Sequence, residues 1–198
     1  MAALDWVFAA ERAYVAAAVG GAAAAAPALD PAHAIAAAGA IASRYLAVGT
    51  PRSFGIIVDA AGDVEAAALS LAAHHAWFAP RDVRCACTGS AGAAELVAAE
   101  LAASTGGAVV SVGEALACDI VCVYSTRIRI APTQLRRGTH VNAVAADVFD
   151  PELFQLATVV REAGLPALAA GLVDGRQLDE LTIFVVDGAP IARAGLAG

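Results

Sequence analysis

The stretch Ser53-Phe-Gly-Ile-Ile-Val58 decides the fold, because it is apolar along nearly its whole length. A strand that faces water on one side alternates between apolar and polar residues, whereas a strand covered on both faces is a continuous apolar run. A helical pattern over 63–77 and a second short apolar strand, Val83 to Cys87, follow it. A strand, a helix and a strand at this spacing predict a parallel sheet with a right-handed crossover.

The rest of the chain repeats this alternation, and its 198 residues suit one domain. Helices are predicted at 4–19, 32–47, 91–104, 114–117 and 166–172, and strands at 109–112, 120–124, 140–145 and 158–160. The sequence therefore predicts an α/β fold with a Rossmann-like, doubly wound parallel sheet over residues 48–198. Residues 1–47 form an N-terminal helical segment before it.

Composition and charge narrow the class of function. The hydrophobic fraction is 60% and the mean hydropathy is +0.69, but alanine supplies much of both and buries little area per residue. The longest low-polarity stretch, Ala13 to Leu29, is mostly Ala and Gly and contains Pro27, so we expect no membrane span. Glu11 and Arg12 interrupt any signal-peptide core, which favours the cytoplasm. A net charge of −7 argues against a nucleic-acid partner.

The four cysteines fall in C-x-C and C-x₃-C pairs: Cys85 and Cys87, then Cys118 and Cys122. Neither pair has common zinc-ligand spacing with a histidine nearby. In a Rossmann sheet the two host strands also flank the first strand and do not touch each other. We therefore expect buried thiols that act as small hydrophobic groups, with a metal site as the alternative.

Four segments, in the correct order, resemble the ornithine cyclodeaminase and mu-crystallin family over about residues 34–198. The most specific is Gly138-Thr-His-Val-Asn-Ala-Val-Ala-Ala-Asp147, which is similar to the family's GTHINAVGAD signature. The other segments are Ala40-Ile-Ala-Ser-Arg-Tyr-Leu-Ala47 with Phe54-Gly-Ile-Ile57, Cys118-Asp-Ile-Val121, and Gly175 to Phe184 with Gly188 after it. The resemblance implies a Rossmann fold, NAD(P) as cofactor and a catalytic acid at Asp147.

The departures from the family are as informative as the matches. Family members usually exceed 300 residues, and about a hundred residues between the first helix and residue 32 have no counterpart here. Those residues form the substrate and dimerisation domain, which is thus largely missing. A family arginine that holds the substrate carboxylate falls where Ala34 stands.

The turn that would bind the dinucleotide is also altered. The family's G-x-G-x-x-[AG] turn lets the backbone approach the diphosphate, but here Val58 and Ala60 replace the first two glycines. Asp59 and Asp63 place negative charge where a diphosphate would sit. By family position, the cofactor-binding residues would be Val58, Asp59, Ala60, Gly62, Thr88, Ser125 and Gly188. We expect no tightly bound cofactor, and NAD(P) if any binds.

Several other polar residues have a structural and a functional interpretation. Asp147 assists proton transfer at the substrate amine if the resemblance holds, or caps the helix that Pro151 opens, as Asp150 also could. We expect His140 to be buried and hydrogen-bonded, and Asp119 to be structural. His74 and His75 end a helix, where the helix dipole explains them.

Three functions remain open. The first is a catalytically reduced or non-catalytic homologue that binds a ligand or a partner protein. The second is a working NAD(P)-dependent cyclodeaminase, or an amino-acid or imine oxidoreductase, with unusual cofactor contacts or with a partner subunit that supplies the missing domain. The third is a structural role of the N-terminal helices. We also expect a homodimer, because Trp6, Val7, Phe8, Tyr14 and Val15 offer apolar surface on the first helix.

Overall fold

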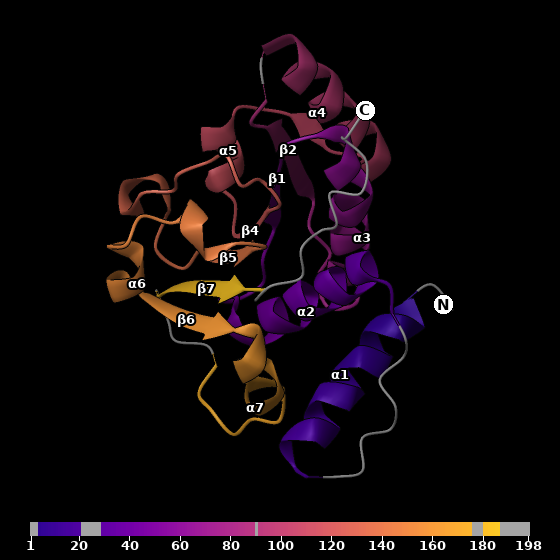
Figure 1. Ribbon diagram of the computed structural model, residues 1–198, viewed down its shortest axis with the longest axis vertical. Helices are drawn as coiled ribbons and strands as arrows, with labels where there is room; N and C mark the ends of the chain where they lie inside the picture. Colours follow the sequence, from indigo (N-terminus) through magenta and orange to yellow (C-terminus); the bar gives the residue numbers. More distant parts are fainter. Residues whose placement is uncertain (1–3, 21–28, 90, 176–179, 187–198) are drawn as a thin grey trace, which may run out of the picture.

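The computed structural model describes residues 4–20, 29–89, 91–175 and 180–186. Within these residues a seven-stranded sheet, parallel throughout, has the order β3-β2-β1-β4-β5-β7-β6 (Figure 1). The strands are β1 (Ser53–Val58), β2 (Asp82–Cys87), β3 (Ala108–Val109), β4 (Ile120–Val123), β5 (His140–Ala143), β6 (Ala157–Arg161) and β7 (Leu181–Val185). The predicted doubly wound parallel sheet is confirmed.

Helices cover both faces of the sheet, as a strand apolar on both sides requires. They are α1 (Asp5–Ala18), α2 (Pro31–Leu46), α3 (Val64–His74), α4 (Ala91–Thr105), α5 (Val112–Leu116), α6 (Leu153–Leu156) and α7 (Leu165–Ala169). Ile56 and Val58 of β1 point to the core shared with α2, α3, α4 and α7. Ile57 points to the other face, beneath α5 and the segment that leads into α6.

Local sequence explains where the main elements begin and how closely they pack. Asp30 caps α2, since its carboxylate accepts the His33 amide at 3.0 Å, and Pro31 occupies the first turn. Gly55 lies where α5 crosses β1, and any side chain there would collide with the Ala115 carbonyl oxygen. Close packing of α5 on the sheet therefore depends on this glycine.

Helix α1 packs on the rest of the same chain. Val7 is fully buried against alanines of α2 and α3, and Phe8 meets Trp77 edge-on with ring centroids 5.7 Å apart. The Glu11 carboxylate accepts from Arg44 at 2.6 Å and from the Tyr45 hydroxyl at 2.7 Å. Residues 1–47 thus contribute α1 and α2 to the common core, and a domain boundary near residue 47 stays a prediction.

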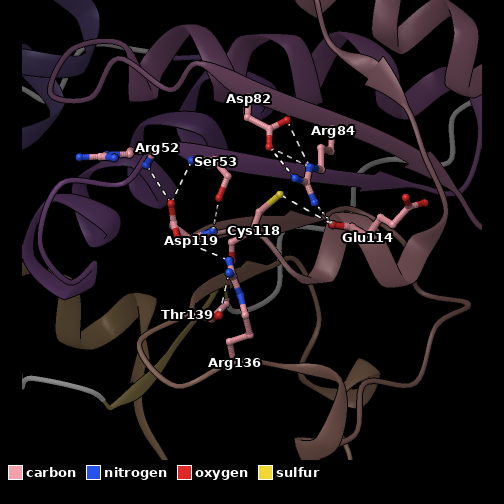
Figure 2. A network of polar contacts seen from close by, with 9 residues as sticks. All are labelled: Arg52, Ser53, Asp82, Arg84, Glu114, Cys118, Asp119, Arg136 and Thr139. Carbon is pink, nitrogen blue, oxygen red and sulfur yellow. Dashed lines mark hydrogen bonds and ion pairs between the residues drawn. The ribbon is translucent and has the colours of Figure 1, made fainter.

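The amino-terminal end of the sheet is tied by a polar network around Asp119 (Figure 2). The Asp119 carboxylate accepts the amides of Arg52 at 2.8 Å and Ser53 at 3.0 Å, and its own amide donates to the Ser53 hydroxyl at 2.9 Å. These bonds hold the starts of β1 and β4 in register. The structural role expected for Asp119 is confirmed.

Some elements differ from the sequence prediction. The strand expected at 109–112 ends at Val109, because Ser111 caps α5 by accepting the Glu114 amide at 3.2 Å. Strand β7 was not predicted, and it lies between β5 and β6. The dipole explanation for His74 is wrong, since its side chain is completely buried and burial lowers its pKa to about 4.

The cysteines occupy the places expected of them in the sheet. All four are free thiols, of which Cys87 is half-buried and the other three are buried. The order β2-β1-β4 separates the two pairs, as predicted. Burial raises the pKa of Cys118 and of Cys122 to about 11, so both stay protonated at neutral pH. No helix within the described ranges is long and apolar enough to cross a membrane.

Candidate functional site

The candidate site lies at the carboxyl ends of β1, β2 and β4. The chain proceeds outward from β1 to β2 and β3, and then returns to place β4 on the other side of β1. Such a reversal leaves a crevice where ligands of open parallel sheets bind. Val58 ends β1, Thr88 follows β2 and Ser125 lies just beyond β4, so three predicted site residues meet there. Gly188 lies outside the described residues.

The carboxylate of Asp59 spans this crevice. It accepts hydrogen bonds from the hydroxyls of Thr88 and Ser125, from the Thr126 amide at 2.8 Å and from the Thr126 hydroxyl at 3.2 Å. Thr88 Oγ1 and Ser125 Oγ are also only 2.9 Å apart. One side chain from the end of β1 therefore binds the loops that follow β2 and β4.

Hydrogen bonding keeps Asp59 ionised. Burial alone would raise the pKa of this carboxyl, but the bonds donated by Ser125, Thr88 and Thr126 outweigh burial and hold the pKa below its ordinary value. The crevice therefore contains a full negative charge at neutral pH. That charge is the opposite of what a diphosphate site needs.

A second carboxylate occupies the turn between β1 and α3. Asp63 accepts the amides of Asp59 and Ala60, each at 3.2 Å. In a dinucleotide-binding turn, amides at this place point toward the diphosphate. Two donors that could bind a diphosphate from the turn, the amides of Asp59 and Ala60, are therefore already paired within the chain.

Val58 and Gly62 can be compared with the glycine-rich turn that binds a dinucleotide. The Val58 side chain is fully buried in the core, in the position of the family's first glycine. A side chain added at Gly62 would meet no atom within 4 Å, so no close contact requires this glycine. The residues present do not fit a dinucleotide held in the usual way.

Asp147 lies at the same edge of the sheet, in the short 3-10 turn Ala146–Val148 that follows β5. It is exposed, and its carbonyl oxygen accepts from the Arg129 guanidinium. Helix α6 has no side-chain cap, so neither Asp147 nor Asp150 has the predicted capping role. The role of Asp147 as an acid stays a prediction.

A small cavity lies near these strand ends. A cavity of about 10 Å³ lies between α2 and the strand ends, lined by Gly39, Ser70, Cys122, Tyr124 and Asn142 among others. Such a volume holds about one water molecule. Ala34, which replaces the family arginine, is exposed at the start of α2.

Sequence reasoning placed Asp59, Thr88 and Ser125 in the site but gave them no contacts with one another, and it missed Thr126. The residue types after the strands could have indicated these contacts, because hydroxyl residues follow the second and fourth strands and an acid follows the first. Parallel strands bring these ends to one edge of the sheet. That signal predicts proximity, although it does not specify which donor each oxygen accepts.

A scan against protein-family models and a search of curated proteins give no match. Several solved structures are similar to this chain. An archaeal alanine dehydrogenase dimer with bound NAD has a TM-score of 0.63 and 25% identity over 78% of this chain and 58% of its own. The Δ1-pyrroline-2-carboxylate reductase of Thermococcus litoralis, in complex with NADH and L-proline, has a TM-score of 0.64 and 22% identity over 78% of this chain and 58% of its own.

The probable ornithine cyclodeaminase of Bordetella pertussis has a TM-score of 0.61 and 22% identity over 79% of this chain and 60% of its own. The chain thus spans about three fifths of the length of these neighbours, and the substrate domain is largely missing from its sequence. With the parallel sheet and the strand order already described, these likenesses show that the chain shares the α/β Rossmann-like fold of these dehydrogenase, reductase and cyclodeaminase structures.

Proposed function

We propose that this chain is a non-catalytic, dinucleotide-independent homologue of the cyclodeaminases and reductases, which acts by binding a partner protein or a small ligand. The observation that carries the proposal is the Asp59 carboxylate, which accepts four hydrogen bonds across the crevice. A cofactor would have to displace these bonds before it could contact the strand ends.

The electrostatic cost of such a cofactor is substantial. A carboxylate about 4 to 6 Å from a phosphate costs on the order of 1 to 4 kcal/mol, depending on the effective dielectric constant. That cost corresponds to about one to three decades of affinity. Asp59 and Asp63 both contribute to it, and Asp63 also pairs two amides of the turn.

The position that the resemblance gives to the substrate-binding arginine also carries no cation. Hydride transfer requires the carrier and the substrate α-carbon in contact, with a cation to fix the substrate carboxylate. Ala34 supplies no cation, and His33 beside it already contacts Asp30, with Nδ1 and Oδ2 2.8 Å apart. A single acid such as Asp147 contributes about two to four decades of rate only when the substrate is already in place.

The alternative is an NAD(P)-dependent cyclodeaminase or amino-acid oxidoreductase. It is favoured by the neighbours whose structures contain NAD or NADH. In this case Asp59 would have to rotate out of the crevice, and a partner subunit would supply the substrate domain.

Turnover separates the two functions. The purified chain is incubated with NAD or NADP and with ornithine, lysine, proline or alanine, while ammonia release and reduced cofactor are followed. We expect no rate above background. Turnover that disappears in Asp147→Asn would establish the enzyme function instead, and turnover that requires a second protein would indicate a split active site.

A further inference from the structure

We infer that the diphosphate site of this fold is blocked by the chain's own carboxylates while its hydrogen-bond donors persist, with Asp59 and Asp63 acting as built-in substitutes for the anion. This inference rests on the proposed function, and it explains why a dinucleotide is not used. It also predicts which ligands a variant without the two acids would bind at this site. These are a diphosphate or a similar polyvalent anion.

The first argument is the number and kind of donors that the two carboxylates occupy. Asp59 accepts one backbone amide and three hydroxyls, and Asp63 accepts two further amides. Backbone amides at a strand-to-helix turn, together with nearby hydroxyls, are the donors that bind phosphate oxygens in other proteins. The carboxylate oxygens have replaced an anion in a site whose donors are still present.

The second argument is that the scaffold of the site persists. The reversal of strand order between β1 and β4 is intact, and α3 follows β1 through one short 3-10 turn, Ala61–Asp63. Ala60 and Gly62 are exposed, and no atom crowds Gly62. A ligand could therefore reach the turn amides once the acids no longer occupy them.

The third argument concerns stability. The Ser125 hydroxyl is fully buried and contacts Asp59, Thr88 and the Arg127 amide. Removal of Asp59 takes away four accepted hydrogen bonds, one of them from the buried Ser125 hydroxyl, which destabilises the folded state. An anion that takes the place of the carboxylate binds only the folded state and must restore stability. If the Asp59 carboxylate occupies an anion site, an added anion should restore the stability of a variant that lacks this carboxylate.

The test compares the unmodified chain with the double variant Asp59→Gly/Asp63→Ser, which removes both carboxylates. Thermal unfolding is measured against inorganic pyrophosphate, with sodium chloride at matched ionic strength as reference. We expect a lower Tm for the double variant, a rise in its Tm with pyrophosphate, and no rise for the unmodified chain. By calorimetry, removal of the acids should tighten pyrophosphate binding about tenfold to a thousandfold.

Two further variants keep the test decisive. Asp59→Asn retains the shape of the side chain, so it folds even where the double variant does not, and it should bind pyrophosphate more tightly than the unmodified chain. Glu114→Gln removes an acid from another first helical turn, where Glu114 caps the Ser111 amide at 2.9 Å, away from the crevice. Pyrophosphate should not change its Tm.

The outcomes distinguish the inference from the proposed function. If neither the double variant nor Asp59→Asn gains affinity for pyrophosphate, the site is lost and not blocked, and the inference fails while the proposed function stands. Equal pyrophosphate affinity in the unmodified chain and the variants would also overturn it. Turnover by the unmodified chain would contradict the proposed function itself.

Discussion

At the scale of single residues, two buried histidines join the helices to the sheet. His74 Nε2 lies 2.8 Å from the Ser43 hydroxyl, and His140 Nε2 lies 3.0 Å from Asn142 Oδ1. The Asn142 amide also donates to the Ser43 hydroxyl at 2.8 Å, which completes a chain of contacts from α3 through α2 to β5. The buried, hydrogen-bonded state predicted for His140 is confirmed.

These histidines make stability depend on pH. Burial lowers the pKa of His74 to about 4 and that of His140 to about 3, from about 6.5 in the unfolded chain. Between about pH 6.5 and pH 4 the unfolded chain binds more protons, so stability is full above about pH 6.5 and falls as pH falls. The slope approaches about 1.4 kcal/mol per pH unit for each histidine.

Urea unfolding between about pH 7 and pH 4.5 measures this dependence. His74→Gln should flatten the slope whatever its effect on stability at neutral pH, because one buried titrating group is gone. Val19→Gln is the control, since Val19 is an exposed side chain that does not titrate and should leave the slope unchanged. An equal slope in His74→Gln and the unmodified chain would contradict the assignment.

Asp59 shows what sequence can and cannot predict about single residues. The negative charge of Asp59 and its place after the first strand were evident from the sequence, and the resemblance placed it at the diphosphate. Its hydrogen bonds were not, because Thr88 and Ser125 are 29 and 66 residues further along the chain. Their meeting depends on the loop conformations after β2 and β4, which no local pattern determines.

At the scale of elements, α1 packs against the rest of its own chain. Its Val7, Phe8 and Glu11 contact α2 and α3, or the segments next to them, within the same chain. The apolar surface proposed for dimerisation is thus partly used in this packing. What remains most exposed is its end, where Val19 is 65% accessible.

A homodimer through the N-terminal helices, expected from the apolar side chains of Trp6, Val7, Phe8, Tyr14 and Val15, stays a prediction, and sedimentation velocity tests it. We expect a dimer that dissociates in Val19→Asp, since a charge placed in an apolar contact is costly to bury. Leu96→Asp is the control, because Leu96 is also an exposed apolar residue but lies on α4. A monomer at high concentration, or equal effects of both substitutions, would count against the dimer.

Other elements were predicted to the extent that their patterns are local. Strands β1, β2 and β4 are short apolar runs, and each was predicted to within one residue at both ends. Strand β3 was predicted too long because the Ser111 cap starts α5 early. The insertion of β7 between β5 and β6 is a crossover, and strand order beyond the first reversal does not follow from periodicity.

At the scale of the whole molecule, the sheet and the candidate site depend on different numbers of residues. The fold depends on apolar patterns spread over many strands, so it persists when single residues at the strand ends change. The candidate site depends on a few residues, among them Val58, Asp59, Ala60 and Asp63. A few substitutions can therefore change the chemistry of the site without changing the sheet.

The most direct test of this account is a calorimetric titration of the unmodified chain with NADH and with NADPH. A crevice that contains the ionised Asp59 carboxylate predicts no measurable binding of either dinucleotide at concentrations up to the millimolar range. A micromolar or tighter dissociation constant for NADH or NADPH, or a dinucleotide retained through purification, would contradict it.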